Sequence, residues 1–252
     1  MTQFASSSVR FLETDGANLA YLVGGSGPGV LIPWCNFSWL DLPYPNVLAE
    51  RFTVVVASPR GFGRSTRPEA DDYSTDMLAA DLLAVTTAVG LARFSVFGYS
   101  LAGAVAAWLA HQSDRVSAIV AGGFPLLGSY RRLLADVEQK VAEGAGDAAA
   151  RAAINAEFDS RAAVAFYRHL ATMPDGALVD RVSCPMYSFW GERDEIIDTL
   201  GEGVAELEAG LRSRRVTTHA LPGLDHLGAL LSPGPALPEI VDWLSAPTRR
   251  SS

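Results

Sequence analysis

Residues 95–103 contain the pattern that decides the fold: Ser95-Val96-Phe97-Gly98-Tyr99-Ser100-Leu101-Ala102-Gly103. Ser100 stands between a predicted strand and a predicted helix, with a small residue two positions away on either side. A strand-to-helix turn this sharp strains the serine backbone and presses those neighbours together, so bulky side chains there would clash. The turn holds the hydroxyl above the sheet beside a helix N-terminus, where the amide of Leu101 can donate to a developing oxyanion. The pattern predicts a nucleophilic serine; the alternative is a plain strand, loop and helix carrying a surface serine.

On both sides of this turn, short β-branched runs alternate with longer helical stretches. This alternation is typical of a mostly parallel sheet that helices cover on both faces. The clearest strand, FTVVVA at 52–57, is apolar throughout and suited to burial on both faces. A hairpin around Asp15-Gly16 is expected to form an antiparallel entry to the sheet. The predicted strands are 9–13, 18–23, 30–33, 52–57, 94–97, 116–121, 186–190 and 215–221.

Helices are predicted where apolar residues recur at intervals of three or four. Such a stretch covers 74–89 and is expected to end at Gly90 as a C-cap. Two further helices of the core are predicted at 101–111 and 235–244.

Between Gly122 and Cys184 the alternation of strands and helices stops. Three helices are predicted there without a strand between them, at 130–143, 147–158 and 161–170. We interpret them as a lid inserted between two core strands. The predicted division is therefore a core of residues 1–122 and 184–252 with a helical cap of residues 123–183.

A serine hydroxyl is a weak nucleophile, so the predicted chemistry requires a general base. The chain has four histidines, and His226 follows a predicted strand directly, at the edge where open α/β sheets bind ligands. His226 is therefore the predicted base. The other three are expected to be structural: His111 as a helix C-cap, His169 as a surface or pocket-wall residue, and His219 within the packing of the last strand.

The base also requires an acid that orients it, and four carboxylates follow the predicted strand 186–190. They are Glu192, Asp194, Glu195 and Asp198. Spacing alone does not choose between them, and a solvated loop residue is the default interpretation of each.

Composition and charge exclude several classes of function. A length of 252 residues, 49% of them hydrophobic, fits one large domain or one domain with an insertion. The net charge of −8 and the lack of a clustered basic face argue against nucleic-acid binding. Neither a membrane span nor a signal peptide is expected. We expect a cytoplasmic enzyme that acts on a small molecule, and a homodimer stays open.

The two cysteines, Cys35 and Cys184, have no metal-ligand spacing and form no disulfide framework. Cys35 follows a predicted strand and Cys184 precedes one, so they are expected at opposite edges of the sheet, beyond disulfide reach. No metal and no cofactor are expected.

From about Leu19 to Leu244 the chain resembles the α/β-hydrolase superfamily, in the serine-nucleophile branch with a helical cap between the sixth and seventh core strands. The resemblance implies an α/β fold with a mostly parallel, eight-stranded sheet flanked by helices. Five features match in order: the glycine turn before Val30, the motif Arg60-Gly61-Phe62-Gly63-Arg64-Ser65, the serine turn, the motif Gly191-Glu192-Arg193-Asp194 and the motif Gly223-Leu224-Asp225-His226.

The resemblance also implies a mechanism. The catalytic acid of the family occupies the last position of the G-x-x-D motif, which selects Asp194 here. Ser100 would attack an acyl carbonyl while His226 takes its proton and Asp194 steadies the imidazolium. The backbone amides of Leu101 and Cys35 would hold the oxyanion. The implied activity is cleavage of a small, largely apolar ester, lactone or thioester through an acyl-enzyme.

The loop after the third strand departs from the family pattern. Relatives carry His-Gly there, whereas this chain has Pro33-Trp34-Cys35-Asn36. The departure keeps two alternatives open: a lyase, acyltransferase or cyclase that acts on a biosynthetic intermediate, and a receptor that binds a small molecule. Substrate contacts are expected from Trp34, Tyr99 and Phe124. Packing between lid and core is the favoured interpretation of any single lid aromatic.

Overall fold

The computed structural model describes residues 8–14, 16–35, 39–69, 73–144, 159–201 and 203–246. Its strands form one eight-stranded sheet in the order β1-β2-β4-β3-β5-β6-β7-β8. The first two pairings, β1 with β2 and β2 with β4, are antiparallel, and all the others are parallel. The strands are β1 Arg10–Thr14, β2 Ala17–Gly24, β3 Gly29–Pro33, β4 Thr53–Ala57, β5 Phe94–Tyr99, β6 Val116–Gly122, β7 Met186–Gly191 and β8 Thr217–Leu221.

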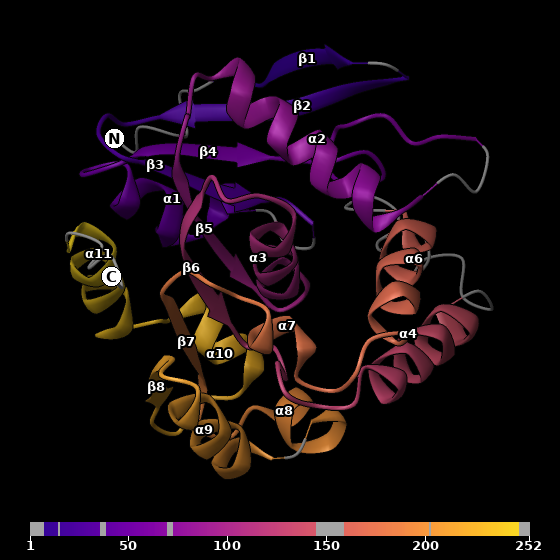
Figure 1. The fold of residues 1–252 in the computed structure, drawn as a ribbon, viewed down its shortest axis with the longest axis vertical. Helices are drawn as coiled ribbons and strands as arrows, with labels where there is room; N and C mark the ends of the chain where they lie inside the picture. The colour runs from indigo at the N-terminus through magenta and orange to yellow at the C-terminus, as the bar shows by residue number, and fades with distance from the viewer. Residues whose placement is uncertain are drawn as a thin grey trace.

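The central strands are apolar on both faces because helices cover both. Successive side chains of a strand point to opposite faces, so Val55 of β4 packs in one core cluster while Val54 and Val56 pack in another. The first cluster contains side chains of α2 (Thr75–Ala88) and α3 (Leu101–Gln112), and the second contains those of α1 (Pro43–Leu48) and α11 (Ala236–Ser245). Figure 1 shows α2 and α3 in front of the sheet.

The strands and the long helices of the core agree with the sequence prediction within two residues at each end. Ser74 caps α2 by accepting a hydrogen bond from the amide of Met77, and Gly90 follows the helix with a φ of 82°. The last strand begins at Thr217, later than predicted, because Arg215 adopts a φ of 62° that strands do not use.

Several short helices were not predicted from the sequence. They are η1 Trp39–Asp41, α1 Pro43–Leu48, α7 Ala177–Asp180, α8 Glu195–Leu200, α9 Val204–Ser213 and α10 His226–Leu231. Apart from α9, which has ten residues, these helices have no more than two turns and are too short to show a clear apolar period, so their stability comes from caps and tertiary packing. Two of these helices lie at the candidate site: α8 begins directly after Asp194, and α10 begins at His226.

Between β6 and β7 the chain forms α4 (Tyr130–Gly144), α6 (Ser160–Leu170) and α7. The predicted helix at 147–158 lies outside the described residues. Helices α4 and α6 pack side by side at one end of the molecule (Figure 1). No strand interrupts the described part of this segment, but its role as a cap of residues 123–183 stays a prediction.

The N-terminus of α6 is fastened to the core. The amide of Asp159 donates to the carbonyl of Gly61 at 2.6 Å, and the hydroxyl of Tyr73 donates to its carboxylate at 3.0 Å. Arg161 pairs with the same carboxylate and donates to the carbonyls of Pro68 and Glu69. These contacts tie the segment between β6 and β7 to the loop that follows β4.

None of the helices in the described ranges is long and apolar enough to cross a lipid bilayer.

Candidate active site

The turn between β5 and α3 places Ser100 in a strained conformation. Its φ of 54° and ψ of −128° lie outside the regions that side chains other than glycine favour. A side chain at Gly98 would collide with the carbonyl of Ala102 one turn later, so the small residue two positions before the serine is required by space. The amide of Ser100 donates to the carbonyl of Gly122 at 2.8 Å, which ties the turn to the end of β6.

Asp194 and His226 are in hydrogen-bond contact. The Nδ1 atom of His226 lies 2.9 Å from Oδ2 of Asp194, and the exposed fractions of the two side chains are 8% and 0%. The other carboxylate oxygen of Asp194 accepts from the amides of Ile196 and Ile197, because Asp194 is the N-cap of α8. The cap fixes the carboxylate, and the carboxylate fixes the imidazole with Nε2 directed away from it.

The other three carboxylates of this loop have different partners. Glu192 accepts from the amide of Gly223 at 2.9 Å, Glu195 from the amide of His226 at 3.2 Å, and Asp198 from the amide of Val204 at 3.1 Å. Of these four acidic residues, Asp194 is the one whose carboxylate meets the imidazole. The geometry thus makes the choice that spacing left open.

The loops after β7 and β8 are joined by main-chain hydrogen bonds. The amide of Glu192 donates to the carbonyl of Leu221 at 2.9 Å, and the amide of Arg193 donates to that of Leu224 at 2.8 Å. A side chain at Gly191 would collide with the carbonyls of Leu224 and Asp225, so the glycine lets the loops approach. This contact brings Asp194 and His226 together although they are 32 residues apart in the sequence.

His226, the predicted base, lies against Tyr99, the residue that precedes Ser100. The hydroxyl of Tyr99 donates to the carbonyl of His226 at 2.8 Å, and the two rings have centroids 5.2 Å apart. Among the described residues, no hydrogen bond joins the hydroxyl of Ser100 to the imidazole. The structure therefore brings the predicted acid and base into contact and places the predicted nucleophile next to the tyrosine that holds the base. The bond between Ser100 and His226 stays a prediction.

The other histidines lie elsewhere. His111 is in the last turn of α3, as expected, but its Nε2 lies 3.0 Å from the carbonyl of Leu178 in α7; burial lowers its pKa. His169 packs edge-on against Trp108 at a centroid distance of 4.6 Å. His219 lies within β8, as expected, and not in a loop. It is half-buried and its Nδ1 lies 2.7 Å from Glu239 of α11, because β8 is the edge strand.

The loop after β3 is tightly packed where the structure describes it. Trp34 is 7% exposed, and its amide donates to the carbonyl of Ala57 at 2.7 Å. Cys35 is a free, fully buried thiol whose pKa burial raises well above the usual range, so a second nucleophile at this position is not supported. Residues 36–38, which include Phe37, lie outside the described ranges.

The predicted substrate contacts are largely buried. Phe124 is 3% exposed, and Tyr99 is fully buried with its hydroxyl engaged by His226. Phe166 and Tyr167 of α6 also belong to the core cluster, as expected for packing between these helices and the sheet. Of the three residues predicted to contact substrate, Tyr99 is therefore the one whose environment indicates a different role.

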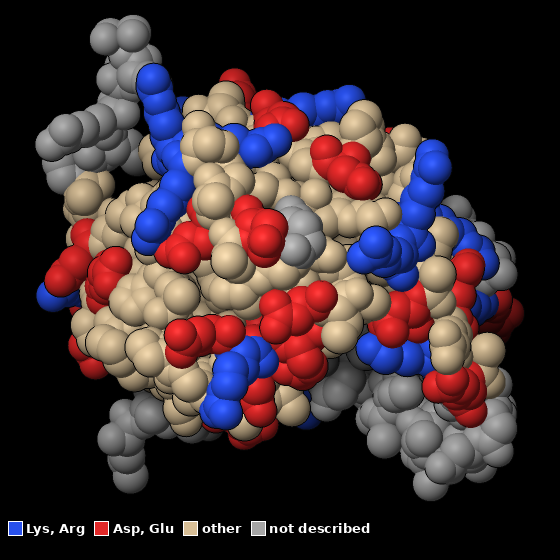
Figure 2. Space-filling view, turned by 90° about the horizontal axis from the view of Figure 1, so that it is seen from below, with Lys and Arg blue, Asp and Glu red and all other residues tan. Residues whose placement is uncertain are grey.

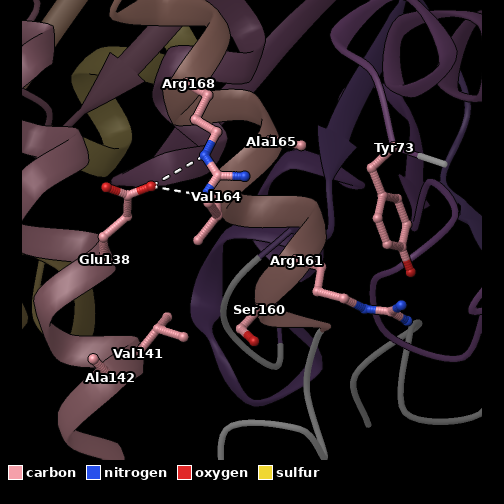
Figure 3. Close-up of a pocket in the computed structure, with 9 residues that line it drawn as sticks. All are labelled: Tyr73, Glu138, Val141, Ala142, Ser160, Arg161, Val164, Ala165 and Arg168. Atoms are coloured by element: carbon pink, nitrogen blue, oxygen red, sulfur yellow. Dashed lines mark hydrogen bonds and ion pairs between the residues drawn. The ribbon is translucent and has the colours of Figure 1, made fainter. Parts of the chain in front are cut away.

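A pocket of about 710 Å³ lies apart from these residues, between α4 and α6 (Figure 3). Val141 and Val164 are among its apolar residues, and Glu138 of α4 pairs with Arg168 of α6 at 2.8 Å across it. Tyr73 and Arg161 lie on the other side of α6 (Figure 3). Ser100, Asp194 and His226 are not among the residues that line it.

Charged side chains of both signs share the surface of the molecule. Figure 2 shows acidic and basic side chains interspersed over one face of the molecule. Within the described ranges, no group of three or more His, Cys, Asp and Glu side chains is arranged to hold a metal ion.

Comparison with known proteins agrees with the architecture. Residues 27–127 match the profile of a family described as the alpha/beta hydrolase fold. An uncharacterized protein of Mycobacterium tuberculosis (strain ATCC 25618 / H37Rv) is 32% identical over 127 residues, which are 47% of this chain and 36% of that protein. A fluoroacetate dehalogenase of Burkholderia sp is 29% identical over 102 residues, which are 37% of this chain and 33% of that protein. The match thus spans about a third of the length of these relatives.

A solved structure from work on carboxylesterases of Nitrososphaera gargenis has a TM-score of 0.73 with this chain at 18% identity. The match covers 93% of this chain and 97% of that chain. At this identity the likeness shows the fold alone. Together with the family profile it confirms the predicted fold class, with its mostly parallel eight-stranded sheet flanked by helices.

Proposed function

We propose that this protein, which has the α/β-hydrolase fold, is a serine hydrolase that cleaves a small, largely apolar ester, lactone or thioester. The nucleophile would be Ser100, the general base His226 and the orienting acid Asp194. The hydrolase-like fold and the hydrolases among the similar proteins support the general class, and the residues of the site support the specific chemistry.

One observation carries the proposal. The buried Asp194–His226 hydrogen bond of 2.9 Å lies beside a strand-to-helix turn whose serine has a φ of 54°. A His–carboxylate pair can serve structure alone, and a strained serine can be a turn residue. Both lie at the carboxyl ends of β5, β7 and β8, so together they would supply a base, its orienter and a nucleophile at one edge of the sheet.

In the proposed reaction, the hydroxyl oxygen of Ser100 bonds to the acyl carbon while Nε2 of His226 takes the hydroxyl proton. Asp194 stabilises the imidazolium and fixes its tautomer through Nδ1. The amides of Leu101 and Cys35 would donate to the oxyanion. As the acyl–oxygen or acyl–sulfur bond breaks, His226 returns the proton to the leaving group. Water activated by His226 then hydrolyses the acyl-enzyme.

The dehalogenase relative raises a different chemistry. Ser100 stands where the covalent alkyl-enzyme route of dehalogenases uses an aspartate, so that route is disfavoured. Trp34 and Phe124 remain the proposed substrate contacts, with the helices between β6 and β7 as the proposed cap.

A second candidate is a non-hydrolytic enzyme of the same fold: a lyase, acyltransferase or cyclase. The observation that favours it is the packed loop after β3. Trp34 stands where relatives have glycine, and its buried indole Nε1 has no hydrogen-bond partner among the described residues. A bulky residue here narrows the space for the carbonyl of an ester. A receptor is less favoured because binding alone does not require a base beside the serine.

The experiment is labelling with a fluorophosphonate probe, followed by a panel of ester, lactone and thioester substrates. The wild-type protein should be labelled at Ser100 and should turn over a short-chain substrate. Ser100→Ala should lose labelling completely and lower kcat by about 10⁴-fold or more. Ser95→Ala is the matched control, because Ser95 lies on the same strand with its hydroxyl near that of Ser117.

Three outcomes separate the candidates. A folded wild-type protein that the probe does not label would overturn the proposed function. Labelling at Ser100 without turnover across the panel would favour the non-hydrolytic enzyme. Labelling that persists in Ser100→Ala would place the nucleophile at another residue.

A further inference from the structure

Tyr99 is a buried residue beside the site that has no role in the reaction proposed above. Its ring is fully buried on β5 and packs against Phe189 at a centroid distance of 5.5 Å. Side chains at Gly122 and Gly123 would collide with this ring, and Gly123 also has a φ of 55°. Two successive glycines, one at the end of β6 and one directly after it, thus leave the space that the ring fills, which holds the ring in one orientation.

The hydroxyl of Tyr99 is directed at the base. It donates to the carbonyl oxygen of His226 at 2.8 Å, while the ring lies against the imidazole. The next residue along β5 is Ser100. A single side chain, fixed on the nucleophile's own strand, therefore contacts the main chain of the predicted base.

His226 is held at two further points, one by Asp194 in the loop after β7 and one by Glu195, the first residue of α8. Asp194 binds its Nδ1 at 2.9 Å, and the carboxylate of Glu195 accepts from its amide at 3.2 Å. These two contacts fix His226 relative to β7. The Tyr99 hydroxyl fixes it relative to β5, the strand that ends at the nucleophile.

The Tyr99 hydroxyl is a permanent donor. Burial, with a further contribution from the charge of Asp194, raises the pKa of Tyr99 far above its usual value. The group stays protonated wherever the enzyme could work, so it holds the carbonyl and takes no part in proton transfer.

We infer that Tyr99 is a positioning residue that sets the placement of His226 relative to Ser100 through its hydrogen bond to the His226 carbonyl. This inference rests on the proposed function and deepens it. It replaces the sequence-based expectation that Tyr99 contacts substrate. A hydroxyl that acts in this way influences the rate of attack by Ser100 and leaves substrate binding unchanged.

The chain provides a matched control for the test. Tyr44 is also fully buried, and its hydroxyl donates to the carbonyls of Leu230 at 3.0 Å and Ala229 at 3.3 Å. These carbonyls belong to α10, the helix that begins at His226, but they lie one turn beyond the base. Tyr44→Phe and Tyr99→Phe thus each remove a hydroxyl that donates to a carbonyl of α10. Only Tyr99→Phe removes the hydrogen bond to His226 itself.

The experiment compares both variants with the wild-type protein in fluorophosphonate labelling rate, kcat, KM and thermal midpoint. Tyr99→Phe should lower the labelling rate and kcat together by about 5- to 10-fold, the worth of one hydrogen bond, with KM unchanged. Tyr44→Phe should lower the thermal midpoint about as much as Tyr99→Phe does, but it should leave the labelling rate and kcat within about 2-fold of wild type.

A readout independent of turnover is the downfield NMR signal of the proton between His226 and Asp194. It should broaden through faster solvent exchange in Tyr99→Phe and stay sharp in Tyr44→Phe. Unchanged labelling and an unchanged signal in Tyr99→Phe would overturn the inference while leaving Ser100 as nucleophile. Equal losses of labelling rate and kcat in the two variants would mean that the Tyr99 hydroxyl contributes to stability alone, and would also overturn the inference. An unlabelled wild-type protein would overturn the proposed function, and the inference with it.

Discussion

In the part of the chain that the structure describes, two histidine–carboxylate pairs look alike locally. In one, Nδ1 of His226 lies 2.9 Å from Asp194; in the other, Nδ1 of His219 lies 2.7 Å from Glu239. Each pair has a buried tyrosine beside it. Tyr99 bonds to the main chain of His226, and the hydroxyl of Tyr187 lies 3.2 Å from Nδ1 of His219.

The two pairs differ in burial and in what lies nearby. The side chains of His226 and Asp194 are 8% and 0% exposed, whereas those of His219 and Glu239 are 21% and 49% exposed. His226 follows the carboxyl end of β8, beside the turn that carries Ser100, while His219 lies within β8 and joins this edge strand to α11. The shorter bond therefore belongs to the pair without a strained serine beside it. A short bond to a carboxylate does not by itself identify a general base; the position relative to a nucleophile does.

The largest expected difference between the pairs is in catalysis. His226→Ala should lower kcat/KM by about 10³- to 10⁵-fold, because Ser100 would lose the group that takes its proton. His219→Ala should stay within about 2-fold of wild type, since surface substitutions away from the site change little. Steady-state kinetics on the best substrate of the ester panel measures both. Comparable losses in the two variants would break the distinction between the pairs.

Substitution of the two carboxylates should also affect kcat differently, by a smaller factor than substitution of the two histidines. Asp194→Asn keeps the shape of the acid but cannot stabilise the imidazolium, so kcat should fall by about 10²- to 10⁴-fold. Glu239→Gln should leave kcat unchanged. The pH dependence of kcat measured on both variants checks the effect. If Asp194→Asn kept the full rate, Glu195 or another carboxylate of the loop would have to orient His226.

The smallest expected effect is on stability. Glu239→Gln should lower the free energy of unfolding by about 0.5 kcal/mol, because the pair is partly exposed and polar contacts at the surface contribute little. Denaturant unfolding at neutral pH, with His219→Ala and the double variant in a cycle, isolates the coupling between the two side chains. A coupling of about 2 kcal/mol or more would show that this pair holds α11 to the sheet more strongly than its exposure suggests.

Much of the fold could be predicted from the sequence because local rules specify it. Gly98 and Ala102 predicted the serine turn, since only small residues fit there, and the apolar runs predicted all eight strands. His226 could be singled out by its place directly after a strand. The short helices α8 and α10 could not be predicted, because each is six residues long and depends on its aspartate cap, Asp194 or Asp225.

The sequence by itself determined the class of fold, the strained turn at Ser100 and the strand-end position of His226, because each follows from neighbours a few residues away. Only the tertiary structure decided which of four carboxylates meets the imidazole, that His219 faces Glu239, and that the hydroxyl of Tyr99 donates to the carbonyl of His226. The contacts of His226 join β5 to the loops after β7 and β8, and the contact of His219 joins β8 to α11. The physical reason is that their partners are up to 127 residues apart, a distance over which spacing in the sequence carries no information about contact.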